Sequence, residues 1–177
     1  MILIQCTKKL LDELHIDDSK VAISHPTYSM LENWHANLIR VERKKCLLFT
    51  NDSTLFSFLI PRVTKQHFQH LSSVFINNLS LNLAYESLDE HLSILIPPSP
   101  TDISFIKSNS RKILGSMNGI VLTIHSYIAH SGGLNELNVL ALNHVLNNIP
   151  LKVNQYRNAL ECLHTKIQQS FHTKCET

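Results

Sequence analysis

The chain has 177 residues, of which 44% are hydrophobic and 17% are charged, and its formal net charge is +2. This length favours one domain that can bury a core, and so small a net charge does not by itself indicate a nucleic-acid or membrane partner. No stretch approaches the roughly 18 apolar residues of a membrane span. The apolar start, Met1–Gln5, is also too short for a signal peptide. We therefore expect a cytoplasmic protein with reduced thiols and no membrane partner.

The beginning of the chain predicts a short strand at residues 2–5 and a helix over Lys8–Leu14 that Thr7 caps. A polar connection follows at residues 17–27, for which we predict no regular structure.

Three short apolar runs then follow one another at Trp34–Val41, Cys46–Thr50 and Thr54–Ile60. Turn-forming residues separate them, and connections this short join antiparallel strands. The second and third runs are apolar on both faces, so helices should cover both sides of the sheet.

The rest of the chain is mostly helical by its apolar spacing. Helices are predicted over Lys65–Tyr85, Ser87–Ile96, Ser116–His130, Leu134–Asn148 and Val153–Phe171, and a strand over Asp102–Lys107. The buried stripe expected on the helix at Leu134–Asn148 consists of Leu137, Leu140, Ala141, His144 and Val145. We predict an α+β fold with a small antiparallel sheet, a three-strand meander plus the N-terminal strand, covered by about five helices. Residues 1–172 would form one domain and residues 173–177 a frayed tail.

Polar residues at the open end of the first hairpin are the candidates for catalysis. A turn centred between Arg43 and Lys44 would place His35 opposite Asp52, with Asn37 on the same face as His35. A nearby carboxylate favours the charged imidazole. The pair could work as acid and base in a cleft, or His35 could simply satisfy the turn that contains Asp52.

Basic residues are the candidates for binding. They lie near predicted helix starts and at the first hairpin tip, and they are Lys8, Lys9, Arg43, Lys44, Lys45, Arg111 and Lys112. Charged tips are often only solvated, but clusters that converge in space would bind phosphates in a salt-dependent way.

No cofactor or metal is expected. The stretch Gly115–Gly119 lacks both the lysine of a P-loop and the glycine spacing of a dinucleotide fingerprint. His67 and His70 have a spacing suited to a metal but no third ligand, and Cys162 and His164 would point to different sides of a helix.

Several short motifs occur in an order that resembles a bacterial family of uncharacterised proteins, known only as a domain of unknown function. They are Cys6–Leu10, Trp34–Leu38, Arg43–Lys45, Asn51–Thr54 and Lys107–Leu114. The resemblance covers roughly residues 1–125 and departs from the family pattern at Leu55. It implies no known activity, so no catalytic role is transferred.

A second segment, Leu146–Pro150 followed by Tyr156, is similar to the segment that closes the catalytic domain of some transposases. A ribonuclease H-like fold would need strand carboxylates to hold its metals, and Trp34–Val41 has none. Our leading hypothesis is a non-enzymatic binding module of bacterial or mobile-element origin, with a protein or nucleic-acid partner. The alternative is a hydrolase or nuclease-type enzyme that uses His35 with a carboxylate.

Overall fold

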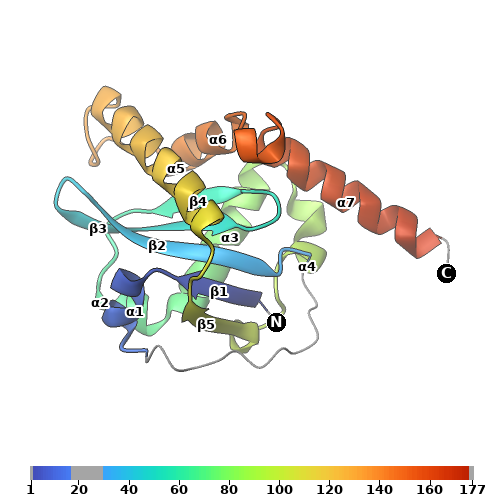
Figure 1. The fold of residues 1–177 in the computed structure, drawn as a ribbon, viewed down its shortest axis with the longest axis horizontal. Helices are drawn as coiled ribbons and strands as arrows, with labels where there is room; N and C mark the ends of the chain where they lie inside the picture. Colours follow the sequence, from blue (N-terminus) through green and yellow to red (C-terminus); the bar gives the residue numbers. More distant parts are fainter. Residues whose placement is uncertain (1, 17–29, 176–177) are drawn as a thin grey trace.

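A five-stranded mixed sheet forms the centre of the computed structural model, with the strand order β4-β3-β2-β1-β5 (Figure 1). The strands are β1 (Ile2–Cys6), β2 (Asn33–Val41), β3 (Lys44–Asn51), β4 (Ser57–Ile60) and β5 (Ile103–Lys107). β1 lies between β2 and β5 and is parallel to both, whereas β3 is antiparallel to β2 and to β4. The structure describes residues 2–16 and 30–175, without the side chains of 153 and 171–175. The predicted connection at residues 17–27 lies outside the described residues.

Seven helices pack around this sheet in the described ranges. They are α1 (Lys8–Leu14), α2 (Lys65–Gln69), α3 (Leu71–Tyr85), α4 (Leu92–Leu95), α5 (Arg111–His130), α6 (Val139–Asn148) and α7 (Ala159–Cys175). Figure 1 shows α5 crossing one face of the sheet and α3 lying behind the other. Both faces are thus covered, as the apolar strands predict.

One face of the sheet carries the aromatic core. Trp34, Phe49, Phe58 and Phe75 are fully buried, and their ring centroids lie 5.0–5.7 Å apart in mostly edge-to-face pairs. The period-2 alternation of β2 and β3 points Trp34 and Phe49 to the side that α3 covers. The opposite face packs against α5 and α6 through a separate aliphatic cluster that includes Ile39, Leu48, Ile120 and Leu142.

The predicted α+β class is confirmed, but the predicted sheet is wrong in two respects. It is mixed rather than antiparallel, because β1 pairs with β2 in parallel after a crossover. It also has five strands, because β5 adds to the free edge of β1. The meander of β2, β3 and β4 is as expected, with consecutive antiparallel pairing.

Several helix boundaries also differ from the prediction. The helix expected over Lys65–Tyr85 breaks at His70 into α2 and α3. α5 begins five residues before the expected Ser116, because Ser110 caps its first turn through Ile113 N–H and the helix accommodates Gly115. α7 begins at Ala159 and continues to Cys175.

The expected buried stripe of α6 was wrong. Its buried residues are Leu142, Asn143, Leu146 and Asn147, whereas His144 is exposed and Val145 is 37% exposed. The reason is that β4 is an edge strand whose outer backbone groups need partners. Asn147 accepts a hydrogen bond from Ser57 N–H (2.7 Å) and donates to Ser57 O (2.9 Å).

Asn143, one helical turn earlier, does the same for the next outward-facing residue of β4. It accepts from Leu59 N–H at 2.9 Å and donates to Leu59 O at 3.4 Å. Its amide also donates to Asn82 Oδ1 of α3 at 2.8 Å. Two asparagines of α6 therefore take the place of a sixth strand and seal this edge against pairing with another chain.

The buried thiol of Cys6 gives a testable pH dependence. Burial raises its pKa from 9.0 to about 12, and the side chain is fully buried. Since the thiolate is the reactive form, we expect Cys6 to resist alkylation by iodoacetamide at pH 8 until the protein unfolds. Peptide mass spectrometry of native and guanidinium-unfolded samples measures this, and rapid native labelling of Cys6 would contradict it. The thiol of Cys6 ionises at a lower pH in the unfolded chain than in the folded protein. The contribution of the buried neutral thiol to the free energy of unfolding is therefore full below about pH 9 and declines as the pH rises towards 12.

Candidate functional site

The turn between β2 and β3 sets the register of the first hairpin. Glu42 and Arg43 both have positive φ, 46° and 65°, as a two-residue type I′ turn requires. Val41 therefore faces Lys44, and His35 faces Thr50. The predicted register, with His35 opposite Asp52, was wrong by two residues, because it assumed a longer turn.

The turn that follows β3 nevertheless brings Asp52 to His35. The Asn51 side chain organises this turn, because its Oδ1 accepts hydrogen bonds from the backbone N–H and hydroxyl groups of Ser53 and Thr54 (2.9–3.1 Å). Asp52 N–H donates to Asn33 O at 2.9 Å, which ties the turn to the start of β2. This local geometry shortens the third strand, so β4 starts at Ser57 rather than at the predicted Thr54.

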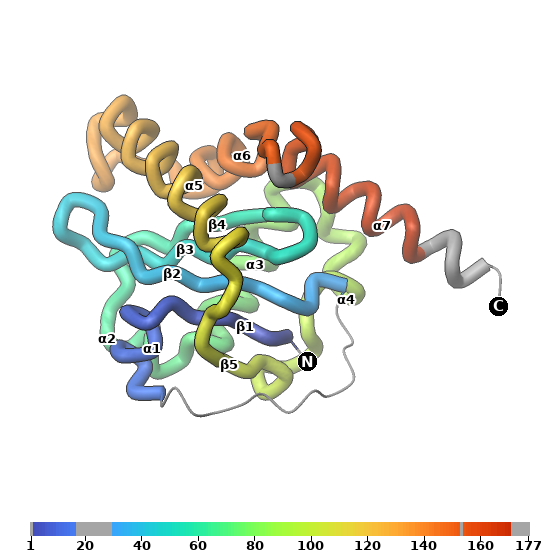
Figure 2. The backbone as a smooth tube through the Cα atoms, viewed as in Figure 1, coloured from blue at the N-terminus to red at the C-terminus, as the bar shows by residue number. Residues whose placement is uncertain are grey.

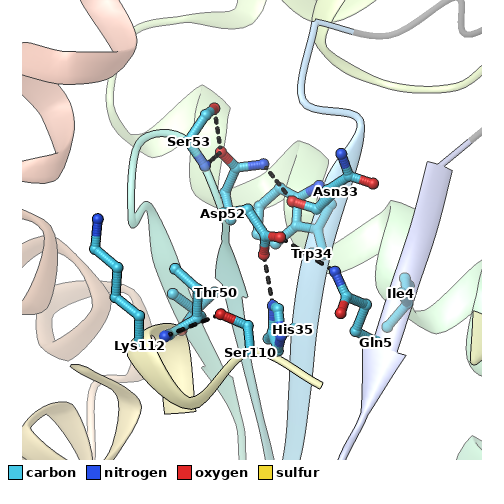
Figure 3. Close-up of polar contacts among 12 residues, drawn as sticks. Ile4, Gln5, Asn33, Trp34, His35, Thr50, Asp52, Ser53, Ser110 and Lys112 are labelled. Atoms are coloured by element: carbon cyan, nitrogen blue, oxygen red, sulfur yellow. Dashed lines mark hydrogen bonds and ion pairs between the residues drawn. The ribbon is translucent and has the colours of Figure 1, made fainter. Parts of the chain in front are cut away.

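His35 and Asp52 form a contact pair on the face of the sheet that α5 covers (Figure 3). His35 Nδ1 lies 2.5 Å from Asp52 Oδ1, and Gln5 of β1 donates to the other carboxylate oxygen at 3.2 Å. The His35 side chain is fully buried, while that of Asp52 is 26% exposed. Both oxygens of Asp52 thus have a partner from a neighbouring strand. Gln5 was not predicted as a site residue, although it is the one polar residue in the otherwise apolar strand β1.

These residues belong to a polar row across the sheet. Thr50 and Ser57, on the next two strands, are buried and their hydroxyls lie 2.9 Å apart. Asn37 lies further along β2, and its Oδ1 accepts a hydrogen bond from Thr7 at 3.2 Å. The structure therefore brings His35 and Asp52 together but gives Asn37 a different partner.

The free ring nitrogen of His35 decides what this pair can do. An imidazole whose Nδ1 faces a carboxylate can use Nε2 as a base, as in the hydrolase triads. Here Nε2 is buried, with no hydrogen-bond partner among the described residues. A base must come within hydrogen-bond reach of the proton that it removes. In this conformation, a substrate therefore cannot reach the nitrogen that would act.

Three surface cavities formed by the described residues lie elsewhere, and His35 lines none of these three. In the part of the chain that the structure describes, no three His, Cys, Asp or Glu side chains are grouped as a metal site. Within residues 2–16 and 30–175, no helix combines the length and apolar character that crossing a membrane requires.

Four of the basic candidates follow the carboxyl ends of two neighbouring strands. Lys8 and Lys9 open α1 directly after β1, and Arg111 and Lys112 open α5 a few residues after β5. β1 and β5 are parallel neighbours, and Ser108 N–H donates to Cys6 O at 2.9 Å beyond their last pairing. The two basic pairs therefore both follow the carboxyl ends of adjacent strands, and all four side chains are exposed.

The β2–β3 tip extends from the same end of the sheet, because β2 is parallel to β1 (Figure 2). Arg43 and Lys44 are exposed there. Lys45 differs from them: its Nζ lies 2.5 Å from Glu13 of α1 and 5.7 Å from the centroid of the Phe68 ring. Lys45 therefore joins the tip to α1 and is a poorer candidate for binding a ligand.

These features define an α+β domain with a mixed five-stranded sheet, a His–Asp pair whose histidine is buried, and basic residues that follow the carboxyl ends of its parallel strands. A family profile described as "Domain of unknown function (DUF6933)" matches residues 3–162, so the chain belongs to that family. The match confirms the resemblance to an uncharacterised family and extends well beyond residue 125. No curated protein matches the chain. No solved structure matches it either.

Proposed function

We propose that this domain is a non-enzymatic binding module, of bacterial or mobile-element origin, whose partner is a nucleic acid held through its phosphates. The observation that carries the proposal is the basic end of the sheet, defined here as Lys8, Lys9, Arg43, Lys44, Arg111 and Lys112. Ligands of open sheets with parallel strands commonly bind outside the carboxyl ends of those strands. All six side chains are exposed.

The placement of the two helices adds to this support. α1 and α5 each begin with two basic residues, and neither has an acidic residue in its first turn. Cations are unfavourable at a helix N-terminus, where the backbone already carries partial positive charge. Phosphates bound at the start of each helix, beside Lys8 and Lys9 or beside Arg111 and Lys112, would relieve this repulsion. The nearby carboxylates of Glu13 and Glu42 interact with Lys45 and with Leu134 N–H, respectively.

The enzyme hypothesis has less support. It relies on His35 and Asp52, whose contact is well formed, but His35 is fully buried and lines none of the three cavities described above. The pair instead holds the turn after β3 against β1 and β2.

Charge reversal tests the binding proposal. We expect Lys9→Glu and Lys112→Glu each to weaken the binding of a fluorescent duplex or single-stranded oligonucleotide, because each reversal removes a cation that faces phosphate and adds repulsion. The double variant should bind roughly tenfold or more weakly than the wild-type protein at low salt. Lys45 is left unchanged, because its reversal would bring two carboxylates together. Fluorescence anisotropy gives the affinities.

Lys152→Glu is the matched control, because it changes the net charge by the same amount as each single reversal. Lys152 is exposed in the connection between α6 and α7, and this connection contacts the turn after β3, away from the basic end. If Lys152→Glu weakens binding as much as Lys112→Glu does, net charge alone governs binding and the basic end is not the site.

A further inference from the structure

A cavity of about 390 Å³ lies at the end of the sheet opposite the β2–β3 tip. It is bounded by the turn after β3, by the connection between α6 and α7, and by the first half of α7. Its lining includes Ser53, Arg157, Thr165 and Lys166. Its volume falls within the range of small-molecule sites. None of the residues named above as candidates for catalysis or for binding lines it.

Two side-chain contacts across the chain hold the walls of this cavity in place. Asn154 donates to Thr54 O at 2.9 Å, and Lys166 Nζ donates to Ser53 Oγ at 3.0 Å. The connection that carries Arg157 is itself closed by backbone hydrogen bonds, including Leu151 N–H to Arg157 O and Arg157 N–H to Asn154 O. The backbone at Arg157 and the Lys166 side chain are therefore fixed on two sides of one cavity.

The charges in the cavity are unbalanced. Its lining contains two cations, Arg157 and Lys166, and no aspartate or glutamate. The Lys166 side chain is half-buried, and this burial lowers its pKa, while the charge of Glu32 opposes the shift only in part. Its hydrogen-bond partner, Ser53, is neutral. A partly desolvated ammonium whose hydrogen-bond partner is neutral is unfavourable, and a bound anion would compensate for it.

We propose that this cavity is a binding site for a phosphate group, held between Lys166 and Arg157. The Arg157 guanidinium offers planar, paired donors that match phosphate oxygens, and Lys166 supplies a compact charge. The hydroxyls of Ser53 and Thr165 can donate to the remaining oxygens. Because the cavity is larger than a phosphate, it has room for a small organic group attached to it, as in a sugar phosphate. This site is separate from the basic end of the sheet and does not depend on the nucleic-acid proposal.

Titration calorimetry at constant ionic strength, with inorganic phosphate and with ribose 5-phosphate as probes, tests the site. Both probes should bind if the phosphate group is recognised, and ribose 5-phosphate should bind more tightly if the rest of the cavity contributes. We expect Lys166→Met and Arg157→Gln each to reduce the affinity by about tenfold or more, because each removes a charge-assisted hydrogen bond. Lys152→Gln, in the same connection but outside the cavity lining, should leave the affinity unchanged.

The proposal is overturned if neither probe binds the wild-type protein, or if Lys152→Gln weakens binding as much as Arg157→Gln does. Arg157 is exposed, so its variant should remain folded even if Lys166→Met does not. NMR of the Lys166 side chain supplies a second readout. Phosphate binding should raise the pKa of Lys166, because an adjacent anion favours the ammonium. Binding that leaves this pKa unchanged would place the ligand elsewhere and contradict the assignment.

Discussion

Replacing Asn147 with leucine should lower the free energy of unfolding by about 2–5 kcal/mol, because it leaves two buried backbone groups of Ser57 without partners, each at a cost of roughly 1–3 kcal/mol. Leucine has nearly the same size, so the destabilisation comes from hydrogen bonding rather than from a cavity. Asn147 is fully buried and bonds both the N–H and the C=O of Ser57. Urea titration followed by circular dichroism gives the stability difference.

Asn148→Leu is the matched control, because Asn148 is exposed and its amide bonds only within the same turn of α6, to His144. We expect this variant to be destabilised by less than about 1 kcal/mol, as for most surface substitutions. Equal destabilisation of the two variants would show that the asparagines do not act by sealing the edge of β4.

Replacing Trp34 with alanine should destabilise the protein by about 3–5 kcal/mol, the range found for large aromatic residues in cores. Trp34 is fully buried, packs edge-to-face against Phe58 and Phe75, and donates its indole N–H to Leu31 O at 2.8 Å. Its removal leaves a cavity where β2 and β4 meet α3, and it also removes the indole hydrogen bond to Leu31 O.

Trp34→Phe separates the two contributions, because it keeps most of the apolar volume and removes only the indole donor and the larger ring. We expect it to destabilise the protein roughly half as much as alanine does, since the hydrogen bond from the indole N–H to Leu31 O is lost. Destabilisation below about 1 kcal/mol for Trp34→Ala would show that the aromatic cluster tolerates collapse and is not the centre of this core.

The apolar runs of the sequence predicted the strands β2 and β3 well, because alternating and continuous apolar patterns report burial directly. The sequence also predicted α1 with the same bounds as in the structure. The parallel pairing of β1 with β2 and β5 could not be predicted in this way. It depends on long connections, and local pattern does not specify where those connections return to the sheet.

Turn geometry explains why the details of the candidate site differed. Glu42 and Arg43 adopt the left-handed backbone conformation without glycine or asparagine, so the sequence carried no signal for a two-residue turn. Leu55 also has a positive φ, 61°, in a segment that was predicted as strand. The contact of His35 with Asp52 forms because the Asn51 side chain folds the turn after β3 back towards β2. The pairing register of the strands does not predict this contact.

The two asparagines that bond the edge of β4, and the cavity lined by Arg157 and Lys166, were not predicted for another reason. Asn143 and Asn147 lie four residues apart beside Leu142 and Leu146, so the only signal was an amide pair on an apolar helix face. Because asparagine is usually exposed, Asn143 and Asn147 were not assigned to the buried face of this helix. The predicted buried face therefore lay towards His144 instead. Arg157 and Lys166 come together with Ser53 only through the tertiary fold, since they lie more than a hundred residues further along the chain.

The salt dependence of nucleic-acid binding tests the proposed function most directly. We expect the logarithm of the affinity of the wild-type protein to fall linearly with the logarithm of the salt concentration, since bound phosphates release counterions. The Lys9→Glu/Lys112→Glu variant should show a slope shallower by about 0.9 for each phosphate that it no longer neutralises, and Lys152→Glu should keep the wild-type slope. Binding that is insensitive to salt, or no binding at low salt, would contradict the proposal that the basic end of this sheet holds a nucleic acid.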